Sequence, residues 1–283
     1  MNTDDLEKFI SLAQSQNMQQ SAAEFDVTPS AMSKALRRIE LLLSTQLFLR
    51  SGKQLILNAH GRRFLPYALA AVKQIDEAQS LIGNLTKDKI KVVGPSILLS
   101  KWASVTTREL LNARTSNISF ESFYEQQSLE SLLQGNADIA IVTREIEHQI
   151  PDMLHTQVLG EFQQVFAVGK THAIVGECSE IGADQLAELD FAVPERSPFC
   201  GEQRGRGCDG WLGTLPERKM PITVNDHNVL LQLIKTGGFV AIVPDYWARE
   251  HQLVILPVVA EALPEKEDVI AVAWQQHWLD ALC

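Results

Sequence analysis

The segment from Val27 to Glu40 places polar and basic side chains at helical spacing close to the amino terminus. Thr28 can cap a helix that starts at Pro29, because the first helical residue needs no N–H donor. Apolar side chains fall on one face of this helix, at Ala31, Met32, Ala35 and Ile39. The opposite face carries Ser30, Ser33, Lys34 and Arg37. These groups suit phosphate oxygens and base edges of a nucleic acid; the alternative is an ordinary solvated helix face.

Charge is unevenly distributed along the 283 residues. Residues 1–87 hold ten Lys and Arg against eight Asp and Glu, whereas the whole chain has a net charge of −10. Between Lys34 and Arg63 there are seven basic residues and one acid, Glu40. Exposed charges more than about 8 Å apart are largely screened at physiological salt. A distant acidic region therefore does not cancel this local basic patch.

The amino-terminal elements position that patch. Thr3 is the expected cap of a first helix, Asn17 of a second and Thr28 of a third, which is the helix-turn-helix order. Leu47–Leu57 predicts a hairpin with a basic tip, so residues 1–60 are expected to form a winged helix-turn-helix DNA-binding domain. The residues expected to contact DNA are Gln19, Gln20, Thr28, Ser30, Ser33, Lys34, Arg37, Arg50 and Lys53.

Residues 61–87 are expected to form a long linker helix that tolerates Pro66 in its first turns. Its apolar seam is Phe64, Ala68, Val72, Ile75, Gln79 and Ile82. A single seam on a long helix is typical of a dimerisation helix, so we expect it to remain unburied within one chain. The alternative is a helix packed on its own domain.

From residue 88 onward strands alternate with helices, which predicts an α/β region with a mostly parallel sheet. We expect two lobes with a cleft between them, lobe I at 88–160 and 265–283 and lobe II at 161–264. Polar residues that follow predicted strands are candidates for binding a small effector with an anionic group. They are Ser96, Ser100, Thr143, Arg196, Ser197 and Asn225. For Ser96 and Asn225 the alternative is helix capping.

Several classes of function find no support in the residues. The histidines and four cysteines lack metal-ligand spacing, and no Gly-x-Ser-x-Gly, Walker or dinucleotide-binding motif occurs. We therefore expect no cofactor, no metal and no enzyme. No apolar run reaches the roughly 18 residues that a membrane span needs, and a signal peptide is not evident, so a cytoplasmic protein without a membrane partner is expected.

The ordered set of motifs resembles the LysR-type transcriptional regulators over essentially the whole chain. In the amino-terminal part the resemblance rests on Ser21–Ala23, Val27–Thr28, Ser30–Lys34, Arg38–Glu40, Leu47–Arg50 and Leu57–Gly61. In the α/β part it rests on Leu133–Ile141 and Gly237–Pro244. Departures are Pro29, where the family commonly has Gln, Ser44 in place of Gly, and a carboxyl terminus that leaves room for only a short closing helix.

The resemblance implies a winged helix-turn-helix, a linker helix and a two-lobed, periplasmic-binding-protein-like effector domain. It also implies a homodimer or homotetramer that binds double-stranded DNA at an interrupted palindrome, with a small molecule between the lobes. RNA polymerase would be a further partner if the protein is an activator. We therefore expect a sequence-specific transcriptional regulator controlled by a small-molecule effector.

Three alternatives stay open. One is a constitutive DNA-binding protein with an unused cleft, and another is an unrecognised enzyme. The third is a thiol-based redox-sensing regulator that uses Cys200 and Cys208, because peroxide sensors in the family use a cysteine pair in this domain and Arg204 and Arg206 would favour a thiolate. The same loop is otherwise an ordinary surface loop or a lid.

Overall fold

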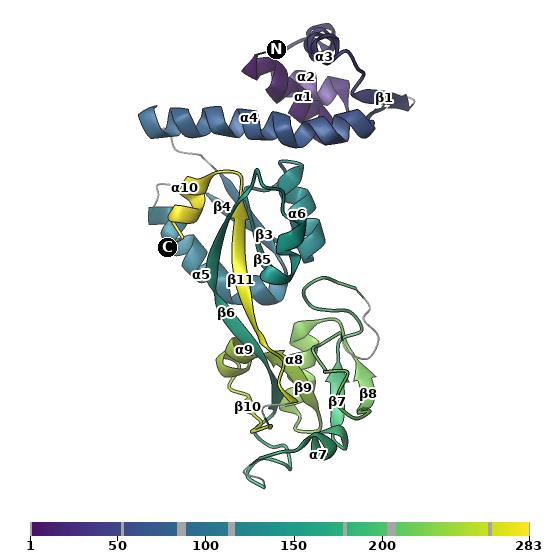
Figure 1. Ribbon diagram of the computed structural model, residues 1–283, viewed down its shortest axis with the longest axis vertical. Coiled ribbons are helices and arrows are strands. Elements are labelled where there is room, and N and C mark those ends of the chain that lie inside the picture. Colours follow the sequence, from purple (N-terminus) through teal and green to yellow (C-terminus); the bar gives the residue numbers. More distant parts are fainter. Residues whose placement is uncertain are drawn as a thin grey trace.

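The computed structural model describes residues 2–51, 54–83, 89–112, 117–177, 180–202, 208–259 and 262–282. Lys53, Arg204 and Arg206 lie outside these ranges. Figure 1 shows a small helical unit, a long helix beneath it, and an α/β region below that helix. The family-wide expectation of an amino-terminal helix-turn-helix followed by a two-lobed α/β region is confirmed.

The amino-terminal unit has three helices and a hairpin: α1 (Thr3–Ser15), α2 (Met18–Glu24), α3 (Pro29–Leu43), β1 (Phe48–Ser51) and β2 (Gln54–Leu57). Asn17 and Thr28 cap α2 and α3 as predicted, but α1 is capped by Asn2, not Thr3. Asn2 accepts the Asp5 amide at 2.8 Å while Asp5 bonds back to the Asn2 amide, a reciprocal capping box. Strands β1 and β2 pair antiparallel and form the wing.

Helix α4 (Ala59–Gly83) crosses beneath this unit (Figure 1). At its start Gly61 lies against the wing, where a Cβ would come within 2.2 Å of the Leu47 carbonyl oxygen. The prediction that the apolar seam stays unburied within the chain is wrong for Ala68 and Val72, which are buried in a core shared with α1 and lobe I. The α/β region supplies a second surface that the sequence pattern of α4 alone does not reveal.

Lobe I and lobe II share one sheet of nine strands, in the order β4-β3-β5-β11-β6-β9-β7-β8 with β10 beside β6. The strands are β3 (Ile90–Gly94), β4 (Ile118–Ser122), β5 (Ile139–Thr143), β6 (His155–Val168), β7 (Asp190–Val193), β8 (Lys219–Thr223), β9 (Val240–Pro244), β10 (Val254–Ile255) and β11 (Lys266–Ala273). The helices are α5 (Ser96–Asn112), α6 (Glu125–Leu133), η1 (Arg144–Gln149), α7 (Ala183–Ala187), α8 (His227–Lys235), α9 (Asp245–Glu250) and α10 (Gln276–Asp280). The closing helix α10 is short, as expected.

The sheet is mixed and not mostly parallel. Within each lobe β3, β4, β5 and β7, β8, β9 pair in parallel, but β6 and β11 run antiparallel to their neighbours. Both long strands connect the lobes (Figure 1). Strand β6 pairs with β11 up to Gln163 and with β9 from Gln164 onward, so the passage between lobes lies at these two residues.

Candidate functional site

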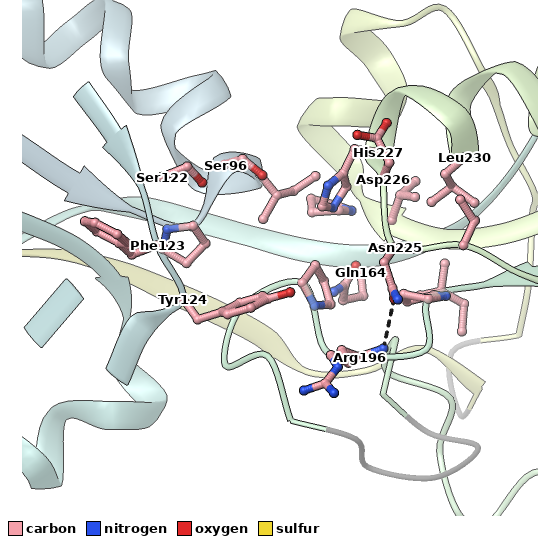
Figure 2. A pocket seen from close by; sticks show the side chains of 18 of the residues that line it. Ser96, Ser122, Phe123, Tyr124, Gln164, Arg196, Asn225, Asp226, His227 and Leu230 are labelled. Carbon is pink, nitrogen blue, oxygen red and sulfur yellow. Dashed lines mark hydrogen bonds between the residues drawn. The ribbon is translucent and has the colours of Figure 1, made fainter. Parts of the chain in front are cut away.

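A cleft of about 280 Å³ lies where the two lobes meet. Figure 2 shows Ser96, Ser122 and Tyr124 entering it from one side and Gln164, Asn225 and His227 from the other. Ser96 begins α5, Ser122 ends β4 and Tyr124 follows it, and Asn225 and His227 follow β8. Gln164 lies on β6 where that strand changes lobes. The cleft is thus built from strand ends of both lobes, the position at which open α/β sheets bind ligands.

The lining is mainly neutral. Among the described residues that line the cleft, Arg196 and Asp226 carry a formal charge at neutral pH. The Asp226 carboxylate caps α8 by accepting the Asn228 and Val229 amides at 2.8 and 3.0 Å. Burial lowers the pKa of His227 against the weaker opposing influence of Asp226, so its ring is uncharged at neutral pH. Hydroxyl and amide groups therefore dominate, with Arg196 as the positive charge.

The structure places three of the six predicted effector residues in this lining: Ser96, Arg196 and Asn225. The Asn225 side chain is nevertheless engaged, since its Oδ1 accepts the Glu195 amide at 2.9 Å and its Nδ2 donates to Glu195 Oε2 at 3.0 Å. It holds the segment after β7 against the segment after β8, and it is not a helix cap, since Asp226 caps α8.

The other three predicted residues do not line the cleft. Ser100 donates to the Ile97 carbonyl of its own helix at 2.7 Å. Thr143 is buried and bonds to Glu125, while Ser197 is buried and accepts the amides of Phe199 and Cys200. Hydroxyls at strand ends satisfy local backbone groups as readily as ligands, so position after a strand did not separate the two uses.

Sequence reasoning missed Ser122, Tyr124, Gln164 and His227. Ser122 ends β4 and Tyr124 follows it, so both lie where polar side chains at strand ends are expected to face the cleft. Gln164 gave no such signal, because it lies inside the long strand β6 and not at a strand end.

The two lobes also touch directly beside the cleft. The amide of Glu125, the first residue of α6, donates to the Phe199 carbonyl of lobe II at 3.1 Å. The Tyr246 hydroxyl of lobe II donates to the Ile97 carbonyl of lobe I at 2.6 Å. The Phe162 ring stacks on Phe199 with centroids 5.4 Å apart. These contacts describe lobes that are in contact around the cleft.

A second site lies between α3 and the wing. An open groove of about 540 Å³ is lined by Ser33 and Arg37 of α3 and by Arg50 of β1, among others. Ser30, Ser33, Lys34, Arg37 and Arg50 are all exposed, as are Gln19, Gln20 and Thr28. Within the described chain the side chains of Lys34, Arg37 and Arg50 have no hydrogen-bond or ion-pair partner. The structure therefore brings the predicted basic face of α3 and the wing to one surface.

Arg38, next to Arg37, has a different role. Its guanidinium forms an ion pair with the buried carboxylate of Asp5 in α1, with Nε 3.1 Å from Oδ1. The hydrogen bond from Arg38 holds the pKa of Asp5 below its ordinary value. This pair fixes α3 on α1, so only part of the basic run is available to a partner.

Comparison with known proteins covers both the amino-terminal unit and the α/β region. The model for the LysR substrate binding domain matches residues 98–280, and the model for the bacterial regulatory helix-turn-helix of the lysR family matches residues 3–62. The chain belongs to the LysR family of transcriptional regulators. It is 28% identical over 253 residues to the regulator ShiR of Corynebacterium glutamicum, covering 84% of this chain and 80% of ShiR.

Solved LysR-type structures share the fold. A full-length, singly substituted OxyR from Pseudomonas aeruginosa matches with a TM-score of 0.72 at 15% identity, covering 100% of this chain and 94% of that one. CbnR in complex with its target DNA matches with a TM-score of 0.53 at 18% identity, covering 100% of this chain and 97% of that one. LysR regulators bind DNA and form oligomers, and this chain has their DNA-binding and effector-binding domains.

Metal sites, membrane-spanning helices and reactive thiols each bear on how this LysR-family chain works. Among the described residues no group of His, Cys, Asp and Glu forms a metal site, and no described helix is long and apolar enough to cross a membrane. Cys200 and Cys208 are free thiols. The Cys208 thiol is buried and lies 2.6 Å from the Pro194 carbonyl oxygen, and burial raises its pKa to about 11. A thiol protonated in this way is a poor nucleophile, which weighs against the redox alternative.

Proposed function

We propose that this LysR-type regulator binds duplex DNA through α3 and the wing. The observation that carries the proposal is the shared groove, in which Ser33, Arg37 and Arg50 are exposed and, for the two arginines, unpaired within the described chain. Arg37 and Ser33 are the base-reading candidates. Gln19, Gln20, Thr28, Ser30, Lys34 and Arg50 would contact phosphates, with Lys53 outside the described residues. The DNA-binding domain would comprise residues 1–60, the linker helix residues 61–87 and the effector-binding domain residues 88–283.

The DNA proposal is tested by selecting duplexes from a random library with the wild-type protein. The expected result is an interrupted palindrome bound with an affinity that falls steeply with salt. Failure to enrich any sequence, or binding that does not depend on salt, would contradict it. The protein would act in the cytoplasm, where bacterial DNA lies, and would contact RNA polymerase if it activates.

The effector is a small polar molecule with one anionic group in the cleft between the lobes. Arg196 is the cation among the described lining residues, and its guanidinium has donors beyond the 3.4 Å contact with the Gly201 carbonyl. Ser96, Tyr124 and Gln164 would bind the hydroxyl, amine or amide groups of the same molecule.

The effector proposal is tested by thermal shift with small carboxylic acids, each paired with its neutral amide. At least one acid should raise the melting temperature more than its amide does, and Arg196→Ala should remove that difference. Arg108→Ala is the matched control, because Arg108 is an exposed arginine outside the cleft lining. Amides that match their acids throughout would contradict the anionic group.

A homodimer would form through α4. The stripe Tyr67, Ala71, Ile75 and Ala78 is exposed along one side of this helix, while Ala68 and Val72 on another side are buried within the chain. An apolar stripe of this kind on a long helix favours association with a second copy.

A further inference from the structure

One end of α6 lies at the effector cleft. Tyr124 precedes the helix, and Tyr124 and Gln127 line the cleft. The loop of residues 197–202 from lobe II rests on this end, because the Glu125 amide donates to the Phe199 carbonyl at 3.1 Å. Gly201, with φ +74°, lies flat on the Tyr124 ring, where a Cβ would come within 2.5–2.7 Å of three ring atoms. The position of the 197–202 loop is therefore set by the first turn of α6.

The other end of α6 contacts the DNA-binding domain of the same chain. Gln134 is the C-cap residue of α6, and its carbonyl oxygen accepts a hydrogen bond from the Gln14 side-chain amide of α1 at 3.0 Å. Gly135 follows with φ +73°. A Cβ atom at this residue would lie 2.5 Å from the Leu69 side chain of α4 and 3.1 Å from the Gln14 side chain. In Figure 1, α6 lies in lobe I below α4. A shift of this end would reach α1 and α4 directly.

The body of α6 is short and firmly packed. Nine residues span about 13 Å at the usual helical rise. Ser128, Leu129 and Leu132 are buried, and Leu129 and Leu132 belong to the same apolar core as Leu69 of α4. Such a helix moves as a unit, since a packed core has discrete arrangements instead of deforming continuously.

A second attachment of α4 to lobe I does not involve α6. Lys73 lies 3.4 Å from Asp138, and the Gln275 side-chain amide donates to the Lys73 carbonyl at 2.9 Å. Among the described residues, α1 and α4 are thus attached to lobe I in two ways. One attachment is made by α6, and the other is made by Lys73 with residues outside α6.

We propose that α6 couples the effector cleft to the DNA-binding domain of the same chain, through the Gly201–Tyr124 contact at one end and the Gln134–Gln14 contact at the other. The inference rests on the proposed function, because it concerns regulation of that DNA-binding activity. Lobe movement that lifts the 197–202 loop from Tyr124 frees α6 to tilt, and the tilt changes how α1 and α4 are held.

The test is a double-mutant cycle on the full-length protein with a duplex selected by the wild type. Gly201→Ala places a methyl group against the Tyr124 ring and lifts the loop without any effector. It should change the Kd for DNA at least five-fold, within the range of allosteric couplings, and speed amide exchange in residues 12–16 of α1. In a Gln14→Ala background the same substitution should change Kd less than two-fold, whereas in a Lys73→Ala background the full effect should persist.

Equal effects of Gly201→Ala in the wild-type and Gln14→Ala backgrounds would overturn the inference. Tyr124→Ala removes the same contact from the other side and replaces Gly201→Ala if that variant does not fold. If both leave Kd and amide exchange in α1 unchanged, α6 does not couple the sites. If the wild type selects no DNA, the proposed function fails, but the exchange measurement still tests the contact between cleft and α1.

Discussion

The carboxyl group of Glu125 is fully buried and bonds through one oxygen to both the amide and the hydroxyl of Thr143, each at 2.7 Å. Its other oxygen, Oε2, has no hydrogen-bond partner within the described residues. Burial raises the pKa of Glu125 from 4.5 to about 7 against the lowering effect of the Thr143 bonds. Glu145 of η1 and Glu267 of β11 add a smaller raising effect.

Stability should therefore fall as pH rises through the window from about 4.5 to about 7. Between these values the folded protein binds the Glu125 proton more tightly than the unfolded chain does, so deprotonation favours unfolding. The full effect is roughly 3 kcal/mol at most. Glu125→Gln keeps an oxygen for both Thr143 donors and removes the ionisation. Urea unfolding at pH 5 and pH 8 should show the variant losing less stability than the wild type; equal losses would mean that the pKa of Glu125 is the same in the folded and unfolded states.

Arg37→Ala should weaken binding to the selected DNA about ten-fold or more without lowering the melting temperature, because Arg37 is exposed and contacts nothing that holds the fold together. Lys34→Ala should act in the same direction. The matched control is Arg38→Ala, which removes the partner of the buried Asp5 carboxylate and should lower the melting temperature. Anisotropy titration and thermal melts separate the two effects. A wild-type Kd in both Arg37→Ala and Lys34→Ala would contradict the assigned DNA face.

The sequence predicted those parts of the fold that depend on local rules. Thr28 and Pro29 set the start of α3, and the spacing correctly predicted burial of Met32, Ala35 and Ile39 but not of Ala31, which is exposed. The exposure of Ser30, Ser33, Lys34 and Arg37 followed, because an exposed face is the complement of a buried one. Burial of Ala68 and Val72 did not follow, since it depends on a core that α4 shares with α1 and with lobe I, which is distant in sequence.

The cleft was predictable in position but only partly in composition. Ser96 and Arg196 follow strands and line it, yet Thr143, the last residue of β5, bonds to the buried Glu125. Which hydroxyl faces a ligand is decided by packing between lobes. Gln164 became a lining residue because β6 crosses from one lobe to the other, a topology that alternating strands and helices do not reveal.

Mild peroxide should leave Cys200 and Cys208 as free thiols, because thiolate is the reactive form and the raised pKa of Cys208 keeps it protonated at neutral pH. The measurement is a thiol count under denaturing conditions, before and after peroxide. In the folded protein at pH 8, Cys200 should react with an aromatic disulfide reagent before the buried Cys208; Cys208→Ser identifies the slow thiol. Formation of a Cys200–Cys208 disulfide, seen by mass spectrometry, would restore the redox alternative.

Placing charge on the exposed side of α4 should dissociate the homodimer. Tyr67 and Ile75 are 63% and 38% exposed, two turns apart, so Tyr67→Glu with Ile75→Glu sets carboxylates along the apolar stripe. Sedimentation should show monomers at concentrations where the wild type is dimeric. The melting temperature of the two lobes should be unchanged. Val175→Glu is the control, because Val175 is also 38% exposed but lies in a turn of lobe II. Since paired half-sites require two linked DNA-binding domains, the doubly charged variant should also bind the selected palindrome more weakly than a wild-type dimer does. A double variant that remains dimeric would place the contact between copies on another surface.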